Sequence, residues 1–126
     1  MSFRGKHVFS DFVDVLNPDG TPPDPRILFD QLIAATESSG ARIVGTLLEE
    51  FDGTESPPGF ASVVLIDESH VTAHSYADEG LLALDVFTCG SVDPEALLEI
   101  FVRSLRALVP AAREISRQVH DRFPEQ

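Results

Sequence analysis

The residues of this chain whose types could do chemistry lie in two short stretches. The first holds Ser69, His70 and His74 between two apolar runs. The second ends in Cys89, the single cysteine of the 126 residues. A hydroxyl, two imidazoles and a thiol can act as nucleophile, base and acid if the fold brings them together.

Spacing alone leaves three interpretations open. Ser69 could form a hydrolase triad with Asp85 and either His70 or His74, but the G-x-S-x-G pattern is absent and a triad is recognised by geometry. The two histidines would lie roughly 13 Å apart on a strand, too far for one metal ion. The third interpretation, which spacing alone favours, is structural: a turn serine, two strand histidines and a buried thiol.

Composition excludes several classes of protein. The chain has 21 acidic and 9 basic residues and a net charge of −12, whereas nucleic-acid binding needs clustered Lys and Arg, so we expect no such partner. No apolar run approaches the ~20 residues of a membrane helix, and the chain begins without a hydrophobic signal region, so we expect a cytoplasmic protein with no membrane partner. A single cysteine excludes an intrachain disulfide and a multi-cysteine zinc site, and we expect no metal.

The elements that must position these residues can be predicted from turn chemistry and periodicity. Asp24-Pro25 and Asp93-Pro94 combine a capping acceptor with proline at the first helical position, and they predict helices that end at Gly40 and Leu108. Alternating or apolar runs predict strands over residues 6–15, 42–51, 61–66, 70–76 and 81–89. Residues 111–121 are expected to form a last short helix or an irregular tail.

The predicted order is therefore β-α-β-β-β-β-α. Short turns between successive strands favour antiparallel pairing. Two helices on one face of such a sheet make a two-layer α+β sandwich, and we expect a single domain over residues 1–126.

Taken together, the two stretches resemble the bacterial S-adenosylmethionine decarboxylase family. The run from Glu68 to His74 (ESHVTAH) is similar to the family's E-S-H-x-x-x-H segment, and the run from Asp85 to Gly90 (DVFTCG) to its D-x-F-T-C-G segment. The likeness extends to Gly5-Lys6-His7 and covers about residues 5–108. Because the paired motifs are specific, the resemblance outweighs the structural interpretation.

The resemblance implies a proenzyme that cuts itself between Glu68 and Ser69, into residues 1–68 and 69–126. Ser69 would become a covalent pyruvoyl cofactor, which binds the α-amine of an amino-acid substrate as a Schiff base and allows its carboxyl group to leave. His74 matches the family histidine that assists processing, and Cys89 matches the general acid that reprotonates the α-carbon. The resemblance also implies a homodimer with shared sites and a role in polyamine biosynthesis.

Three departures from the family pattern concern the substrate and the processing. The family's H-T-W-P-E reads here as residues 74–78 (HSYAD), so the expected substrate contacts are Tyr76 and Asp78, with Glu79 beside them. The loop over residues 51–59 is longer than usual, and the aromatic residue that stacks on adenine would be Phe51 or Phe60. A family serine that helps processing aligns with Ala61.

Two alternative functions follow from these departures. The same chemistry could act on L-arginine or L-ornithine, because Asp52, Glu55, Asp78 and Glu79 could pair with a guanidinium or ammonium group. A family member that is never cleaved could be a non-enzymatic regulatory protein, although the intact Ser69, His74 and Cys89 argue against this.

Overall fold

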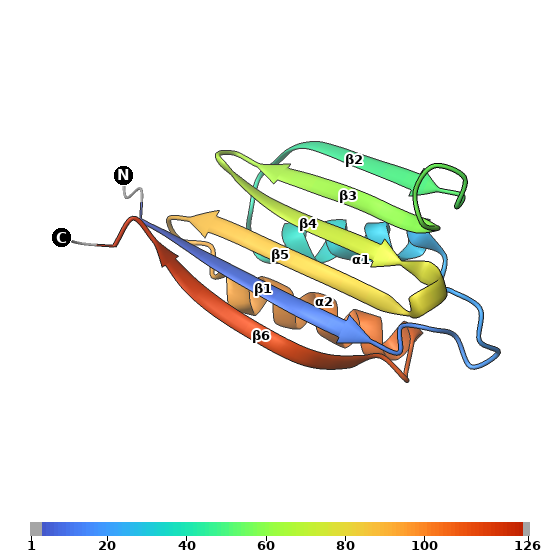
Figure 1. The fold of residues 1–126 in the computed structure, drawn as a ribbon. Helices are drawn as coiled ribbons and strands as arrows, with labels where there is room; N and C mark the ends of the chain where they lie inside the picture. Colours follow the sequence, from blue (N-terminus) through green and yellow to red (C-terminus); the bar gives the residue numbers. More distant parts are fainter. Residues whose placement is uncertain (1–3, 125–126) are drawn as a thin grey trace.

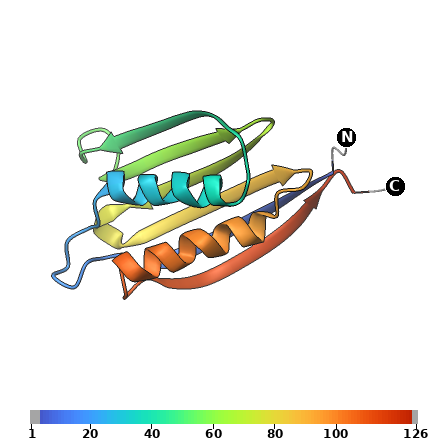
Figure 2. The ribbon, with the colours of Figure 1, turned by 180° about the vertical axis from the view of Figure 1, so that it is seen from behind.

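The computed structural model describes residues 4–124, which form one six-stranded sheet covered on one face by two helices (Figures 1 and 2). The predicted two-layer α+β sandwich is confirmed; the ends of the predicted domain, residues 1–3 and 125–126, lie outside the described range. The strands are β1 (Gly5–Val13), β2 (Ile43–Phe51), β3 (Gly59–Ile66), β4 (Ser69–Tyr76), β5 (Leu81–Cys89) and β6 (Arg113–Arg122). The helices are α1 (Pro25–Ser38), α2 (Pro94–Leu108) and the 3₁₀ turn η1 (Ala77–Glu79).

The strands are ordered β2-β3-β4-β5-β1-β6, and every neighbouring pair is antiparallel. The first strand of the chain therefore lies between β5 and the last strand, as Figure 1 shows. Neither α1, with 14 residues, nor α2, with 15, is long and apolar enough to cross a membrane within the described range.

Both long helices begin where their sequence predicts. The carboxylates of Asp24 and Asp93 accept hydrogen bonds from the backbone N–H of Arg26 and Glu95, each at 2.9 Å. A proline follows each cap, at a position whose missing N–H costs the helix nothing. The capping signal therefore places α1 and α2 correctly along the chain.

Alternation along the strands separates a covered face from an open one. Val64, Val71, Val86 and Val8 pair across four neighbouring strands and are almost fully buried beneath the helices. The side chains between them point the opposite way, because the side-chain period of a strand is two. We call this opposite surface the open face. Its side chains come from the odd-numbered residues of β1, β3 and β5, from the odd-numbered residues of β2 beginning at Gly45, and from the even-numbered residues of β4.

The prediction for residues 111–121 is wrong, because Arg113–Arg122 forms strand β6 along the free edge of β1. Ile115 and Val119 are four residues apart, a spacing that suits one face of a helix as well as one face of a strand. The backbone groups of β1 need partners, and β6 supplies them. No local pattern in residues 111–121 shows that the edge of β1 is free to pair.

A polar cluster fastens β6 to the rest of the fold. The guanidinium of Arg117 donates to Glu114 through Nε at 2.8 Å and Nη2 at 3.0 Å, and it lies 2.5 Å from a carboxylate oxygen of Glu99 on α2. Ser10 on β1 donates its hydroxyl to Glu114. The last strand is thus joined to both the sheet and the helical layer.

We expect Gly59→Ala to lower the free energy of unfolding by about 3 kcal/mol, the upper part of the range for a strained backbone position. Gly59 begins β3 with φ of 150°, and a Cβ there would lie 1.9 Å from the carbonyl oxygen of Ser75. Urea unfolding followed by circular dichroism measures the change. Gly45→Ala is the matched control, because its Cβ would lie 3.7 Å from Leu65, and it should stay within about 1 kcal/mol of wild type. Equal stability of the two variants would contradict the prediction.

Candidate active site

The bond between Glu68 and Ser69 closes a tight hairpin. Strand β3 ends at Ile66, which pairs with Ser69 at the start of β4, so Asp67 and Glu68 alone make the turn. Asp67 has φ of 47°, in the left-handed region that non-glycine residues seldom adopt. The Nε of Arg42 donates to the carboxylate of Asp67 at 2.9 Å and holds it in place. The scissile bond predicted from the motif therefore follows a backbone under local strain.

The hydroxyl of Ser69 is buried and unpaired. The residue is 5% exposed, and its Oγ has no hydrogen-bond partner among the residues that the structure describes. A buried hydroxyl without a partner costs about 1–3 kcal/mol, so such a group calls for an explanation. Ser69 lines a cavity of about 400 Å³ with Glu68 and Cys89. An attack of this Oγ on the carbonyl carbon of Glu68 would pass through a five-membered ring.

Cys89 lies beside this turn on the neighbouring strand. His70 pairs with Phe87, so the last two residues of β5 run alongside the start of β4. Gly5 on β1 lies opposite Cys89, where a Cβ would come within 3.1 Å of Sγ and 2.7 Å of the ring of Phe87. Glycine at the start of the Gly5-Lys6-His7 run therefore leaves space for the thiol and the ring, which a Cβ at this position would crowd.

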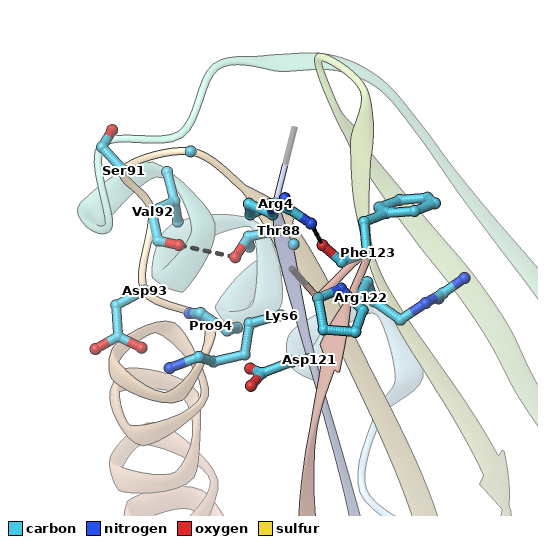
Figure 3. A pocket seen from close by; sticks show the side chains of 13 residues that line it. Arg4, Lys6, Thr88, Ser91, Val92, Asp93, Pro94, Asp121, Arg122 and Phe123 are labelled. Carbon is cyan, nitrogen blue, oxygen red and sulfur yellow. Dashed lines mark hydrogen bonds between the residues drawn. The ribbon is translucent and has the colours of Figure 1, made fainter. Parts of the chain in front are cut away.

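The segment that follows Cys89 separates two cavities. The hydroxyl of Thr88 donates to the carbonyl oxygen of Val92 at 2.7 Å, as Figure 3 shows. This bond ties the segment after Cys89 back to the end of β5. Behind the segment, a second cavity of about 470 Å³ lies at the start of α2, with Lys6 and Asp121 on its wall (Figure 3). Its charges are of both signs, and none of the predicted site residues lines it.

The structure does not bring His74 to Ser69 within one chain. The two residues are five positions apart on β4, so they lie on opposite faces and roughly 17 Å apart along the strand. His74 is exposed on the open face, where it pairs with Ala61 on one side and Ala83 on the other. Ser62, the neighbour of Ala61, is buried on the covered face with an unpaired Oγ, so its hydroxyl does not face His74.

The predicted substrate residues gather at the far end of the sheet. Tyr76, Asp78 and Glu79 line a cavity of about 330 Å³ together with two prolines of the β2–β3 loop. Tyr76 is seven residues from Ser69, which corresponds to roughly 24 Å along β4. This cavity therefore lies beyond reach of the turn in the same chain.

The two aromatic candidates differ in their burial. Phe51 ends β2 on the open face and is 36% exposed. Phe60 is 3% exposed and packs under the helices, so its ring cannot stack on a ligand. Of the two, only Phe51 lies where a ligand could contact it. In the loop between them, the hydroxyl and N–H of Thr54 hold the pKa of Asp52 below its ordinary value.

A pair that the sequence alone did not assign lies on the open face near Phe87. His7 Nε2 is 3.1 Å from Asp85 Oδ1, and the ring of His70 lies 6.3 Å from that of His7 and 5.6 Å from that of Phe87. Burial, and next the charge of His7, lower the pKa of His70. Because Asp85 bonds to His7 and Ser69 points to the other face, Ser69, Asp85 and a histidine do not form a hydrolase triad.

No local signal could have found this pair, since its members are 78 residues apart. Their strands become neighbours only through the strand order of the sheet. Across residues 4–124, no group of three or more His, Cys, Asp or Glu is arranged to hold a metal ion.

Comparison with known proteins gives consistent results. A family model described as S-adenosylmethionine decarboxylase matches residues 6–118. The S-adenosylmethionine decarboxylase proenzyme of Brevibacillus brevis is 33% identical over 118 residues, which cover 90% of this chain and 81% of that protein. The proenzyme of the same description from Anoxybacillus flavithermus is 31% identical over 121 residues, covering 93% and 90%.

A solved structure shares the fold. The crystal structure of the adenosylmethionine decarboxylase from Aquifex aeolicus superposes with a TM-score of 0.72 and covers 100% of this chain and 96% of that one, at 22% identity. At that level of identity the likeness concerns the fold alone.

The lowered pKa of His70 predicts a pH-dependent stability. The pKa of this imidazole is about 6.5 in the unfolded chain and lower in the folded protein. At a pH between these two pKa values the unfolded chain binds more protons than the folded one, so the free energy of unfolding falls as the pH drops below about 6.5. His70→Gln should reduce this fall in the free energy of unfolding between pH 7.5 and 5.5. The measurement is urea unfolding at each pH, made in chains that also carry Ser69→Ala so that they stay in one piece. His120→Gln, at an exposed histidine, is the control and should keep the slope of its parent. Identical slopes for all three chains would refute the assignment to His70.

Proposed function

Because the chain belongs to the S-adenosylmethionine decarboxylase family, we propose that it is a self-cleaving, pyruvoyl-dependent decarboxylase that acts on S-adenosylmethionine in a cytoplasmic step of polyamine biosynthesis. The observation that carries the proposal is the Oγ of Ser69. It is buried, it lacks a hydrogen-bond partner within residues 4–124, and it belongs to the first residue after a tight turn.

Self-cleavage would begin at this hydroxyl. Ser69 Oγ attacks the carbonyl carbon of Glu68, the bond from that carbon to Ser69 N breaks, and the nitrogen takes up the proton, which leaves an ester. A base then removes the α-hydrogen of Ser69, the Cβ–Oγ bond breaks, and Glu68 leaves as a carboxylate. Addition of water and loss of ammonia turn the remaining dehydroalanine into a pyruvoyl group at the new N-terminus.

The residues around the turn suit such a group. Ser69 lines the cavity of about 400 Å³ together with Cys89, and Gly5 leaves space beside the thiol. The pyruvoyl ketone would supply an electron sink for the departing carboxyl group. The thiol of Cys89, partly buried on the neighbouring strand, would hold the proton that the α-carbon then receives.

We further propose that two copies pack open face against open face. This face exposes large apolar side chains, among them Leu47 at 61% and Leu65 at 46%, and a half-covered sheet of this kind buries such residues when it pairs. A two-fold axis that runs parallel to the sheets and perpendicular to the strands would lay the far end of one sheet over the Ser69 end of the other. His74 of the partner subunit would then approach the backbone of Ser69 from the open face, as the base that removes its α-hydrogen, a contact that the separation of roughly 17 Å forbids within one chain.

The same pairing would complete the substrate site. Tyr76, Asp78 and Phe51 of the partner subunit would approach the Ser69 turn from across the interface. Residues 43–102 contain no Lys or Arg, so the acids of the far end are not neutralised by nearby strands. An acidic pocket favours a substrate with a distal cation, here the sulfonium of S-adenosylmethionine. The neighbouring carboxylates of Asp78 and Glu79 in one small cavity keep L-arginine and L-ornithine as the second candidates.

A mixed dimer tests both the cut and the shared site. Ser69→Ala should leave a chain of 126 residues uncut, and His74→Asn should do the same when each variant is produced alone. When both are produced together with different tags, the His74→Asn chain should be cut between Glu68 and Ser69, because its partner supplies the histidine. Mass spectrometry of the two tagged chains reads the outcome.

The competing results are distinct. If a wild-type chain stays in one piece, the protein is not a self-cleaving enzyme and the regulatory alternative stands. If wild type is cut but the mixed dimer is not, the shared site is wrong while the cleavage is right.

The substrate can be identified by release of labelled carbon dioxide. The cleaved enzyme is offered carboxyl-labelled S-adenosylmethionine, L-arginine or L-ornithine in separate reactions, and we expect release from the first alone. Cys89→Ala is the control for the chemistry: it should still be cut, but it should lose at least about 100-fold in turnover, as expected for a general acid. Release from L-arginine or L-ornithine instead would reject S-adenosylmethionine as the substrate.

A further inference from the structure

We infer that Glu49 is a positioning residue for His74 in self-cleavage, an inference that rests on the proposed function. His74 is the residue to which that function gives the role of base. Its direct neighbours across β3 and β5 are Ala61 and Ala83, neither of which can bind an imidazole. The next polar side chains in the same row are therefore the ones that could orient it.

The strand register puts Glu49 in that row. Glu49 on β2 pairs with Ala61, and Ala61 pairs with His74, so all three side chains point to the open face. Two strand spacings separate the Cα atoms of Glu49 and His74 by about 9.6 Å. Only the methyl group of Ala61 stands between them. Both side chains are exposed and no hydrogen bond joins them in the single chain, so both are free to change rotamer toward each other.

The distribution of charge leaves Glu49 few other partners. Strands β2, β3, β4 and β5 contain no Lys or Arg, and their two histidines are His70 and His74. His70 lies near the Ser69 end of the sheet, whereas His74 lies in the row of Glu49. A carboxylate that accepts from one ring nitrogen fixes the tautomer and the direction of the other, which is what a base needs.

Two other carboxylates face the surroundings of His74. Asp85 on β5 lies one step along the strand from Ala83, but it already bonds to His7 at 3.1 Å. Asp11 on β1 lies beyond Ala83 and is, like Glu49, two strands from His74. Its side chain is one methylene shorter than that of glutamate. We therefore assign the role to Glu49 and use Asp11 for comparison.

Dimer formation would strengthen the pair. In the single chain, water surrounds both groups and screens their attraction. A second sheet over the open face would exclude this water, and the attraction between a carboxylate and an imidazolium rises as the local dielectric falls. Glu49 would thus orient His74 at the stage when the histidine meets the Ser69 turn of the other subunit.

The test follows self-cleavage of chains made by cell-free synthesis, with samples taken over time and separated by mass. Glu49→Gln should be cut at least about tenfold more slowly than wild type, since the carboxylate that orients a histidine base can be worth up to about 10⁴-fold. Because His74 acts after the ester between Glu68 and Ser69 has formed, this ester should accumulate in the Glu49→Gln chain. Hydroxylamine should cleave it and release residues 69–126 with an N-terminal serine in place of a pyruvoyl group.

Three further variants separate positioning from a general loss of stability. Glu50→Gln changes the neighbouring carboxylate, which points to the covered side, and should cleave like wild type. Asp11→Asn should also cleave like wild type. Ala61→Ser in the Glu49→Gln chain places a hydroxyl directly opposite His74 and should restore at least half of the lost rate.

The inference fails if Glu49→Gln cleaves at the wild-type rate, if it slows without accumulating the ester, or if Asp11→Asn alone is slow. In each of these cases wild type is still cut, and the proposed function stands. An uncut wild-type chain would overturn the proposed function and this inference with it.

Discussion

Ser69 and His74 lie five residues apart on one strand, and because side chains alternate between the faces of a sheet, one points to the helices and the other points away. No rotamer change reverses this. It separates the buried hydroxyl of Ser69 from the histidine that the family resemblance assigns to the same reaction.

The same alternation divides the other candidate side chains between the two faces of the sheet. The helices α1 and α2 seal the covered face, where Ser69 Oγ is protected from water beside the turn. The histidines, Asp85 and Cys89 all belong to the other face. If that face is the interface between two copies, the base arrives only when two folded chains meet, and an isolated or misfolded chain is not cut in two.

Much of the fold could be predicted from local signals. Asp24-Pro25 and Asp93-Pro94 mark the helix starts, and the turns between residues 51 and 81 give an antiparallel meander. Strand β6 could not be predicted, because Ile115 and Val119 suit a helix equally well and the decisive factor is the unpaired edge of β1.

The site was only partly accessible from sequence. The paired motifs identify Ser69 and Cys89, and the structure places both on one cavity. The pair formed by His7 and Asp85 depends on strand order, which no spacing along the chain reveals. The odd, five-residue interval between Ser69 and His74 does predict that the two side chains point to opposite faces of the sheet. It does not tell which of the two faces the helices cover.

If the chain is cut as proposed, the position of β1 determines how the two pieces are held together. A cut after Glu68 assigns β1, β2 and β3 to one piece and β4, β5 and β6 to the other, and β1 lies between β5 and β6. The two pieces are interlaced rather than side by side, and separating them would break the ladders β3–β4, β5–β1 and β1–β6 together. Folding before the cut is a unimolecular search, whereas reassembly after complete unfolding would require two fragments to find each other. The uncut chain would thus act as its own folding template, and the mature protein would persist because it opens slowly.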